Sequence, residues 1–268
     1  MKYSFNNNLE ALYGIDYCVN RNQNIIKQNE VAEEQNYFDE LYRTFLEHVT
    51  DEVREDTLGI GDYRRKAEYV LSGTNALPDL TAFQDFFLKF QPLQEKVIAD
   101  IQNDETLRRI NLDGLKAFFG IDDADEIDVV LSMFINNGFG VYNGSDNIIL
   151  GVKYSPELGR YKVSEKIADS IYHDFSYPHI RALFEEEGIQ AKNNQTGYLE
   201  ENIARVLEII FTSRIYGDEY IEKMLSAQDK MRLGQVRVFL SLFLENRPKI
   251  TTLKDYTDLL LETGLISK

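Results

Sequence analysis

A chain of 268 residues, 43% of them apolar, can bury a substantial core in one large domain or two packed subdomains. Its 45 Asp and Glu residues outnumber 29 Lys and Arg residues, and the resulting net charge of −16 repels phosphate groups. The composition therefore argues against nucleic acids and anionic membranes as partners. The single cysteine, Cys18, excludes an internal disulfide and a thiolate metal site.

The first residues do not resemble a secretory signal, because Asn6, Asn7, Asn8 and Glu10 interrupt any apolar stretch there. The sequence also contains no apolar run that approaches the roughly 20 residues needed to cross a bilayer. We therefore expect a cytoplasmic protein without a membrane partner.

The first half of the chain is predicted to be mainly helical. Residues 37–49 place Tyr37, Leu41 and Phe45 on one stripe with charged residues opposite, which is typical of an amphipathic helix. Residues 82–90, 93–101 and 112–119 predict three further short helices. We expect Pro92 to separate the first two, because proline disfavours helix interiors.

A small sheet is predicted within about residues 125–155. Its three segments, residues 128–135, 138–142 and 147–154, are short and rich in Val, Ile, Phe and Tyr. Asn-Gly pairs at 137–138 and 143–144 separate them, and this dipeptide favours tight hairpin turns. The pattern predicts a three-stranded antiparallel meander.

Helices are predicted again after the sheet, first a long one over about residues 163–187. Further helices are predicted over residues 198–216, 219–233, 235–245 and 253–263. We therefore expect an α+β fold that is rich in helix. Residues 1–188 would form a mixed subdomain with the sheet and the long helix, residues 189–268 a helical subdomain, and a cleft would lie between them.

The only segment that suggests catalytic chemistry lies on the long helix and reads HDFSY. Residues four apart share a helix face, so His173 and Tyr177 point the same way, with Asp174 beside them. Metallopeptidases use this geometry in HExxH, where two imidazoles bind zinc and the glutamate is the general base. The later helix offers Glu200 and Glu201 as further ligand candidates.

The motifs NxxLEALYGI, FLEH, HDFSYP and YLEENIARVLEI occur in this order. In these motifs the chain resembles a family of uncharacterised bacterial zincin-like metallopeptidases, classed as a domain of unknown function, whose helix reads HEFxHP and whose later helix supplies a glutamate. The resemblance extends to about residue 216. It implies a zincin-like fold, with His173 as the first zinc ligand and Glu201 as the third, and Pro178 matches the family's proline.

Two departures from the family pattern affect the predicted site. The carboxylate of Asp174 lies one methylene nearer the backbone than that of a glutamate, and a displacement of about 1 Å can cost about 100-fold in rate. Tyr177 stands where the second imidazole belongs, and a phenol with a pKa near 10 is a poor zinc donor. We interpret Tyr177 as an aromatic packing residue and Arg205 as the ion-pair partner of Glu201, and we expect zinc to bind weakly or not at all.

Three hypotheses follow. In the first, the chain is related to metallopeptidases, its metal site is degenerate and catalytically impaired, and its cleft binds a peptide or protein, for example by strand addition. In the second, it is an active zinc peptidase in which His173 and Glu201 bind the metal with help from Tyr177 or a water, and Asp174 is the general base. In the third, it is a helical interaction scaffold, the motif is accidental, and His173 and Glu201 lie far apart.

Overall fold

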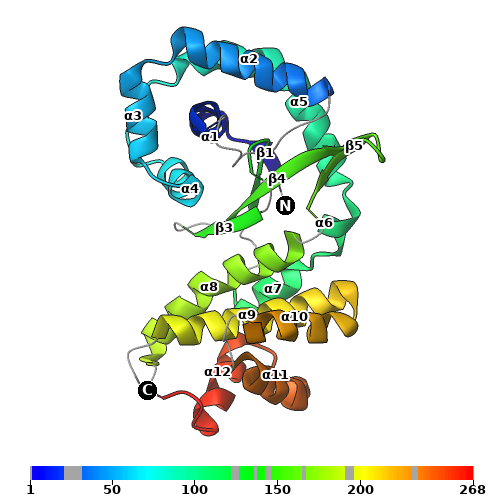
Figure 1. The fold of residues 1–268 in the computed structure, drawn as a ribbon. Helices are drawn as coiled ribbons and strands as arrows, with labels where there is room; N and C mark the ends of the chain where they lie inside the picture. The colour runs from blue at the N-terminus through cyan, green and yellow to red at the C-terminus, as the bar shows by residue number, and fades with distance from the viewer. Residues whose placement is uncertain are drawn as a thin grey trace. The chain divides into compact units, whose positions relative to one another are not determined.

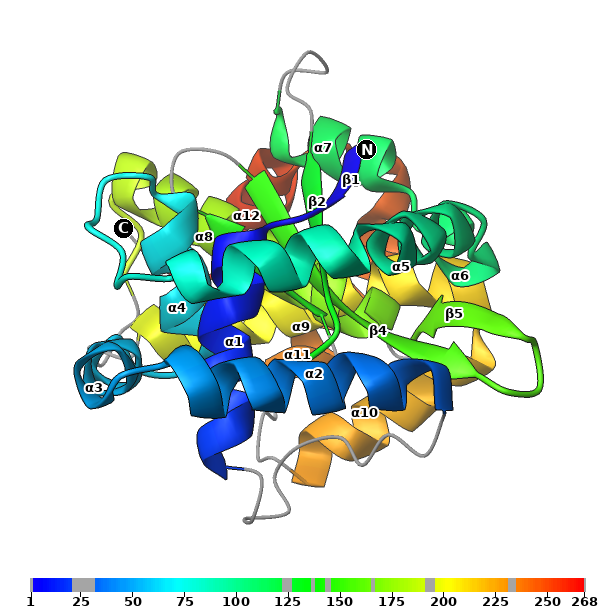
Figure 2. The same ribbon diagram turned by 90° about the horizontal axis from the view of Figure 1, so that it is seen from above.

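The computed structural model describes residues 2–20, 32–121, 127–135, 138–142, 146–164, 167–190, 196–230 and 235–267. These residues form helices together with one small mixed sheet, so the predicted α+β class is confirmed (Figures 1 and 2).

The chain divides into two compact units. One contains Met1–Leu107 and Ile127–Ile167, and the other contains Arg108–Glu126 and Ala168–Lys268. This division differs from the one predicted from the sequence, which grouped the HDFSY helix with the sheet. In the structure that helix belongs to the second unit, where Tyr172 stacks on Phe211 with ring centroids 5.4 Å apart.

The first unit surrounds a helix near the chain start with further helices. In Figure 1, α1 is seen nearly end-on within an arc of three helices, α2, α3 and α4. The helices of this unit are α1 (Asn7–Asn20), α2 (Ala32–His48), α3 (Asp51–Gly59), α4 (Tyr63–Leu71), the 3₁₀ turn Thr81–Phe83, α5 (Gln84–Gln102) and most of α6 (Glu105–Arg109). Aromatic side chains fill the space between α2 and α5, where Tyr37 lies 5.0 Å from Phe86 and 5.1 Å from Phe90 between ring centroids.

Helix α5 runs through Pro92, so the prediction that this proline separates two helices was wrong. Phe86, Phe90, Val97 and Ile101 lie on both sides of the proline and are all buried. Burying this continuous apolar face outweighs the cost of about 3 kcal/mol for an interior proline.

The sheet is mixed rather than an antiparallel meander. Its strands are β1 (Lys2–Phe5), β2 (Asp128–Ser132), β3 (Gly138–Tyr142), β4 (Asp146–Ser155) and β5 (Arg160–Val163). The order is β1-β2-β4-β3, with β5 also paired to β4. Strands β1, β2 and β4 are parallel neighbours, whereas β3 and β5 are antiparallel to β4.

The predicted hairpin between β3 and β4 is present, because Tyr142 pairs with Asp146 in antiparallel register. The predicted hairpin between β2 and β3 was wrong, since β2 pairs with β4 instead. Residues 136–137 and 143–145, which contain Asn137 of the first Asn-Gly pair and the whole of the second, lie outside the described residues. The central residues of β2 and of β4 are buried on both faces, for example Val130 and Ile149, and such unbroken apolar runs are typical of parallel strands.

The described residues of the second unit form helices and their connections, with one isolated β-bridge between Gln190 and Ser267. This unit contains α7 (Leu112–Phe119), nearly all of α8 (Ile167–Glu187), α9 (Thr196–Tyr216), α10 (Glu219–Lys230), α11 (Gln235–Asn246), the 3₁₀ turn Arg247–Lys249 and α12 (Leu253–Glu262). Helix α9 contacts both α10 and α11. Its residues from Ile203 to Thr212 are buried apart from Arg205, so α9 is the central helix of this unit.

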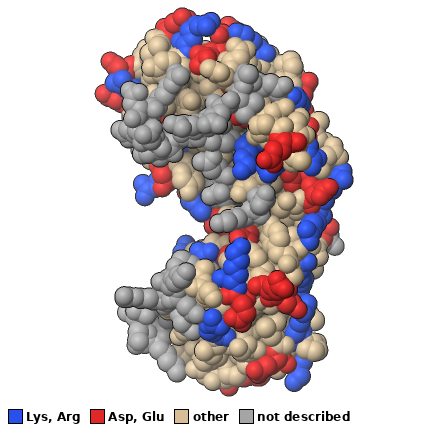
Figure 3. Space-filling model, turned by 45° about the vertical axis from the view of Figure 1, so that its right-hand side comes forward, with Lys and Arg blue, Asp and Glu red and all other residues tan. Residues whose placement is uncertain are grey.

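None of the helices in the described parts of the chain is long and apolar enough to cross a membrane. On the face of the molecule shown in Figure 3, Lys and Arg side chains are interspersed with Asp and Glu side chains. On this face the excess of acidic residues is therefore not gathered into one continuous patch.

Candidate functional site

The predicted site residues lie on two helices of the second unit. Helix α8 carries His173, Asp174 and Tyr177, and helix α9 carries Glu201 and Arg205. Because α9 is enclosed on most sides, its charged side chains need charged or hydrogen-bonding partners to be stable there.

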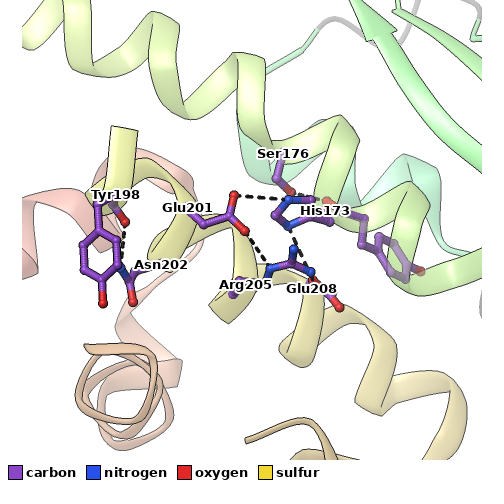
Figure 4. Close-up of polar contacts among 8 residues, drawn as sticks. His173, Ser176, Tyr198, Glu201, Asn202, Arg205 and Glu208 are labelled. Atoms are coloured by element: carbon purple, nitrogen blue, oxygen red, sulfur yellow. Dashed lines mark hydrogen bonds and ion pairs between the residues drawn. The ribbon is translucent and has the colours of Figure 1, made fainter. Parts of the chain in front are cut away.

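His173 of α8 faces two carboxylates of α9. Its Nε2 lies 3.5 Å from Oε2 of Glu201, and its Nδ1 lies 3.4 Å from Oε2 of Glu208 (Figure 4). The structure therefore brings His173 and Glu201 together, as the resemblance implied, and adds Glu208 on the other side of the ring.

Arg205 connects the same two carboxylates. Its Nε donates to Oε1 of Glu201 at 2.8 Å, and its Nη1 donates to Oε2 of Glu208 at 2.8 Å. The predicted ion pair between Arg205 and Glu201 is thus present. His173, Glu201, Arg205 and Glu208 form one group, which we call the His173 cluster (Figure 4).

Burial and neighbouring charges act in opposite directions on the imidazole of the cluster. Burial alone would lower the pKa of His173, but its contacts with the Glu201 and Glu208 carboxylates prevail and raise the pKa to about 9. Contact with His173 is also the main reason why the pKa of Glu201 falls to about 2, against the opposing effect of burial. At neutral pH the imidazolium and the guanidinium balance two carboxylates.

The other two predicted site residues form none of these ion pairs, although the ring of Tyr177 lies 6.4 Å from that of His173 between centroids. Tyr177 lies against Arg181, with 5.3 Å between the guanidinium carbon and the ring centroid, and Arg181 Nε lies 3.5 Å from Oε2 of Glu200. Burial and the nearby Glu200 carboxylate raise the pKa of Tyr177, which makes the phenolate still harder to form. Asp174 is half-buried beside His173, and none of the four contacts of the His173 cluster involves it.

The residues present do not complete the predicted zinc site. Catalytic zinc usually has three protein ligands and a water. His173 and Glu201 converge, but Glu208 faces the opposite ring nitrogen and Tyr177 faces Arg181. Within the described residues, no group of three or more His, Cys, Asp or Glu side chains is arranged to hold a metal ion.

Sequence reasoning missed Glu208, although a signal was available. Glu201, Arg205 and Glu208 are spaced by four and three residues, which places all three on one face of α9. A helix face on which acidic and basic residues alternate predicts an ion network directed at a neighbouring helix.

Polar contacts continue beyond the cluster on α8 and α10. Asp169, one turn before His173, accepts a hydrogen bond from the hydroxyl of Tyr220. Burial and the Asp169 contact raise the pKa of Tyr220, with a smaller contribution from Glu208. His179, the other histidine of α8, packs between Phe119 and Phe175, with ring centroids 5.0 and 5.1 Å away.

No known protein family, curated protein or solved structure matches this chain.

Proposed function

We propose that this chain is a zincin-like relative of the metallopeptidases whose former metal site no longer supports catalysis, and that it acts by binding a peptide or a protein. The observation that carries this proposal is the 3.5 Å approach of His173 to Glu201 from two separate helices. An accidental motif was expected to leave these residues far apart.

The protonation of the cluster supports the loss of catalysis. A histidine must be neutral to bind zinc. Its contacts with Glu201 and Glu208 raise the pKa of His173 to about 9 against the effect of burial, so near pH 7 the imidazole is protonated and zinc would have to displace that proton. The Glu201 carboxylate is engaged by both His173 and Arg205, so zinc would also have to displace one of these partners.

A pocket in the first unit supports the binding part of the proposal. It has a volume of about 470 Å³, within the usual range for ligand sites. Apolar residues of its lining include Leu77, Pro78, Phe87 and Leu88, and polar ones are Asn7, Asn8, Asp79, Thr81 and Gln84. Such a combination suits an extended peptide, because apolar walls accept its side chains and amides pair with its backbone.

The edge of the sheet at β5 is not available for strand addition. The backbone N–H of Tyr161 donates to Asp100 at 2.9 Å, and that of Val163 donates to Asp104 at 3.4 Å. Acidic side chains thus occupy donors that an added strand would use. This favours the pocket over the β5 edge as the place where a peptide binds.

Metal content and peptide cleavage test the catalytic part of the proposal. Protein purified without chelators should contain far less than one zinc per chain, and a peptide library incubated with added zinc should stay uncut. His48→Ala is a suitable control for His173→Ala, because His48 is exposed at the end of α2. Near-stoichiometric zinc that is lost in His173→Ala, with cleavage that is lost in Asp174→Asn, would instead establish the active peptidase.

Selection from a displayed peptide library tests the binding part. Enriched peptides should bind the wild-type protein and lose at least tenfold in affinity for Leu88→Glu, because Leu88 is 67% exposed and lines the pocket. Leu46→Glu is the matched control, since Leu46 is 63% exposed and does not line it. Equal binding to all three proteins would rule out this pocket as the binding site.

A further inference from the structure

The guanidinium of Arg205 occupies an unusual position relative to the predicted zinc ligands. Two of its nitrogens contact one carboxylate each, Glu201 and Glu208, both at 2.8 Å. Those carboxylates are the ones that contact the two nitrogens of His173. Arg205 is therefore the one member of the cluster that contacts both carboxylates without being a possible metal ligand.

We infer that Arg205 is an internal cation that keeps divalent metal ions away from the His173–Glu201 pair. The inference rests on the proposed function, because it explains how a site with two convergent zinc donors can remain free of metal. In this inference Arg205 excludes metal ions from the His173–Glu201 pair. The sequence indicated only that Arg205 forms an ion pair with Glu201.

Charge balance is the first reason. The cluster contains two carboxylates, a guanidinium and an imidazole, and all four side chains are at most 30% exposed. A divalent ion next to Glu201 would add two positive charges near a fixed guanidinium, and such repulsion is weakly screened at a largely buried site. A divalent metal ion could therefore bind next to Glu201 only if one of the positively charged groups of the cluster moved away.

The geometry of the carboxylates is the second reason. Nε of Arg205 contacts one oxygen of Glu201, and His173 contacts the other, so both oxygens of this carboxylate have partners. The same oxygen of Glu208, Oε2, faces both Arg205 and His173. Bidentate or bridging coordination by these carboxylates would require the guanidinium to move.

The inference can be tested by removing the cation while keeping the side-chain volume. Isothermal titration with Zn²⁺ should show weak binding to the wild-type protein. Arg205→Met should bind one Zn²⁺ per chain at least tenfold more tightly, and this gain should disappear in Arg205→Met/His173→Ala. Arg205→Lys, which retains a positive charge, should bind Zn²⁺ no more tightly than the wild type.

Arg181→Met is the matched control. Arg181 also joins α8 to α9, through Glu200, but it does not contact the His173 cluster, so its removal should not increase zinc affinity. Folding of each variant is followed by thermal unfolding with and without Zn²⁺. If Arg205→Met is destabilised, added Zn²⁺ should raise its melting temperature more than that of the wild type, and the absence of such a difference would count against the inference.

The possible outcomes separate the two proposals. Folded Arg205→Met that binds Zn²⁺ no better than the wild type would overturn the role of Arg205 and leave the proposed function standing. Tight zinc binding by the wild-type protein that depends on His173 would overturn the proposed function itself.

Discussion

Buried acidic side chains have different partners in the two units. In the first unit, Glu10 accepts the backbone N–H of Met133 at 3.2 Å, and Asp104 accepts that of Leu107 at 3.2 Å. In the second unit, the buried Glu208 contacts two side-chain cations, Arg205 and His173.

This difference separates acids that stabilise the backbone from acids that form a site. Nearly every residue has a neutral backbone N–H, and a buried one needs a hydrogen-bond acceptor in any sequence with this fold. A carboxylate that accepts such a hydrogen bond therefore meets a general requirement of the fold. A network of side chains exists only because particular residues occupy particular positions. Substitution can therefore change its charge and its ligand preference without altering the fold, which makes the His173 cluster the better candidate for a functional site.

The largest effect is expected for Lys66, whose buried ammonium group pairs with the partly exposed Asp16 in the first unit. Its Nζ lies 3.0 Å from Asp16, and its side chain is only 1% exposed. Lys66→Ala leaves the Asp16 carboxylate without its cation, so we expect the free energy of unfolding to fall by about 4 kcal/mol. Urea denaturation measures this loss, and a decrease below about 1 kcal/mol would show that the pair is not a structural element of this unit.

The pH dependence of stability should distinguish the His173 cluster from the backbone-binding acids. The pKa of His173 is about 9 in the folded protein and near 6.5 when unfolded, so its contribution is complete below pH 6.5 and is lost as the pH rises through 9. We expect at most about 3 kcal/mol of stability to disappear over this range. In His173→Gln the unfolding free energy should be nearly constant there; a decrease as steep as in the wild type would assign the effect to another group.

A smaller loss is expected for Asp104, which accepts from the backbone N–H groups of Thr106, Leu107 and Val163. Asp104→Ala removes these acceptors, and we expect the free energy of unfolding to fall by about 2 kcal/mol. Asp104→Asn retains one acceptor oxygen and should lose roughly half as much. Equal effects of the two substitutions in urea denaturation would mean that charge, rather than hydrogen bonding to the backbone, is what matters at this position.

The smallest effect is expected at the exposed ion pair between Lys254 and Glu187, whose atoms lie 2.7 Å apart. Solvent screens such pairs, so Lys254→Ala should leave the urea midpoint unchanged within error. A shift as large as that of Asp104→Ala would contradict the view that burial decides which charges contribute to stability.

Much of the helical structure follows from local pattern. The apolar spacing in residues 112–119 and 253–263 coincides with α7 and closely with α12, because an amphipathic helix needs only a core to face. The prediction for α5 was wrong at Pro92, because burial of a continuous apolar face outweighed the local cost of a proline within the helix. The strand order could not be read in the same way, since an Asn-Gly turn does not determine which neighbour a strand finally pairs with.

The sequence by itself determined that His173 and Tyr177 share one helix face and that Glu201, Arg205 and Glu208 share another, because side-chain direction within a helix depends only on spacing. Only the tertiary structure decided that α8 and α9 place both nitrogens of His173 against carboxylates, and that Tyr177 instead lies against Arg181. These contacts depend on the packing of two helices against each other, and that packing is set by the apolar residues around α9 rather than by the charged residues that it brings together.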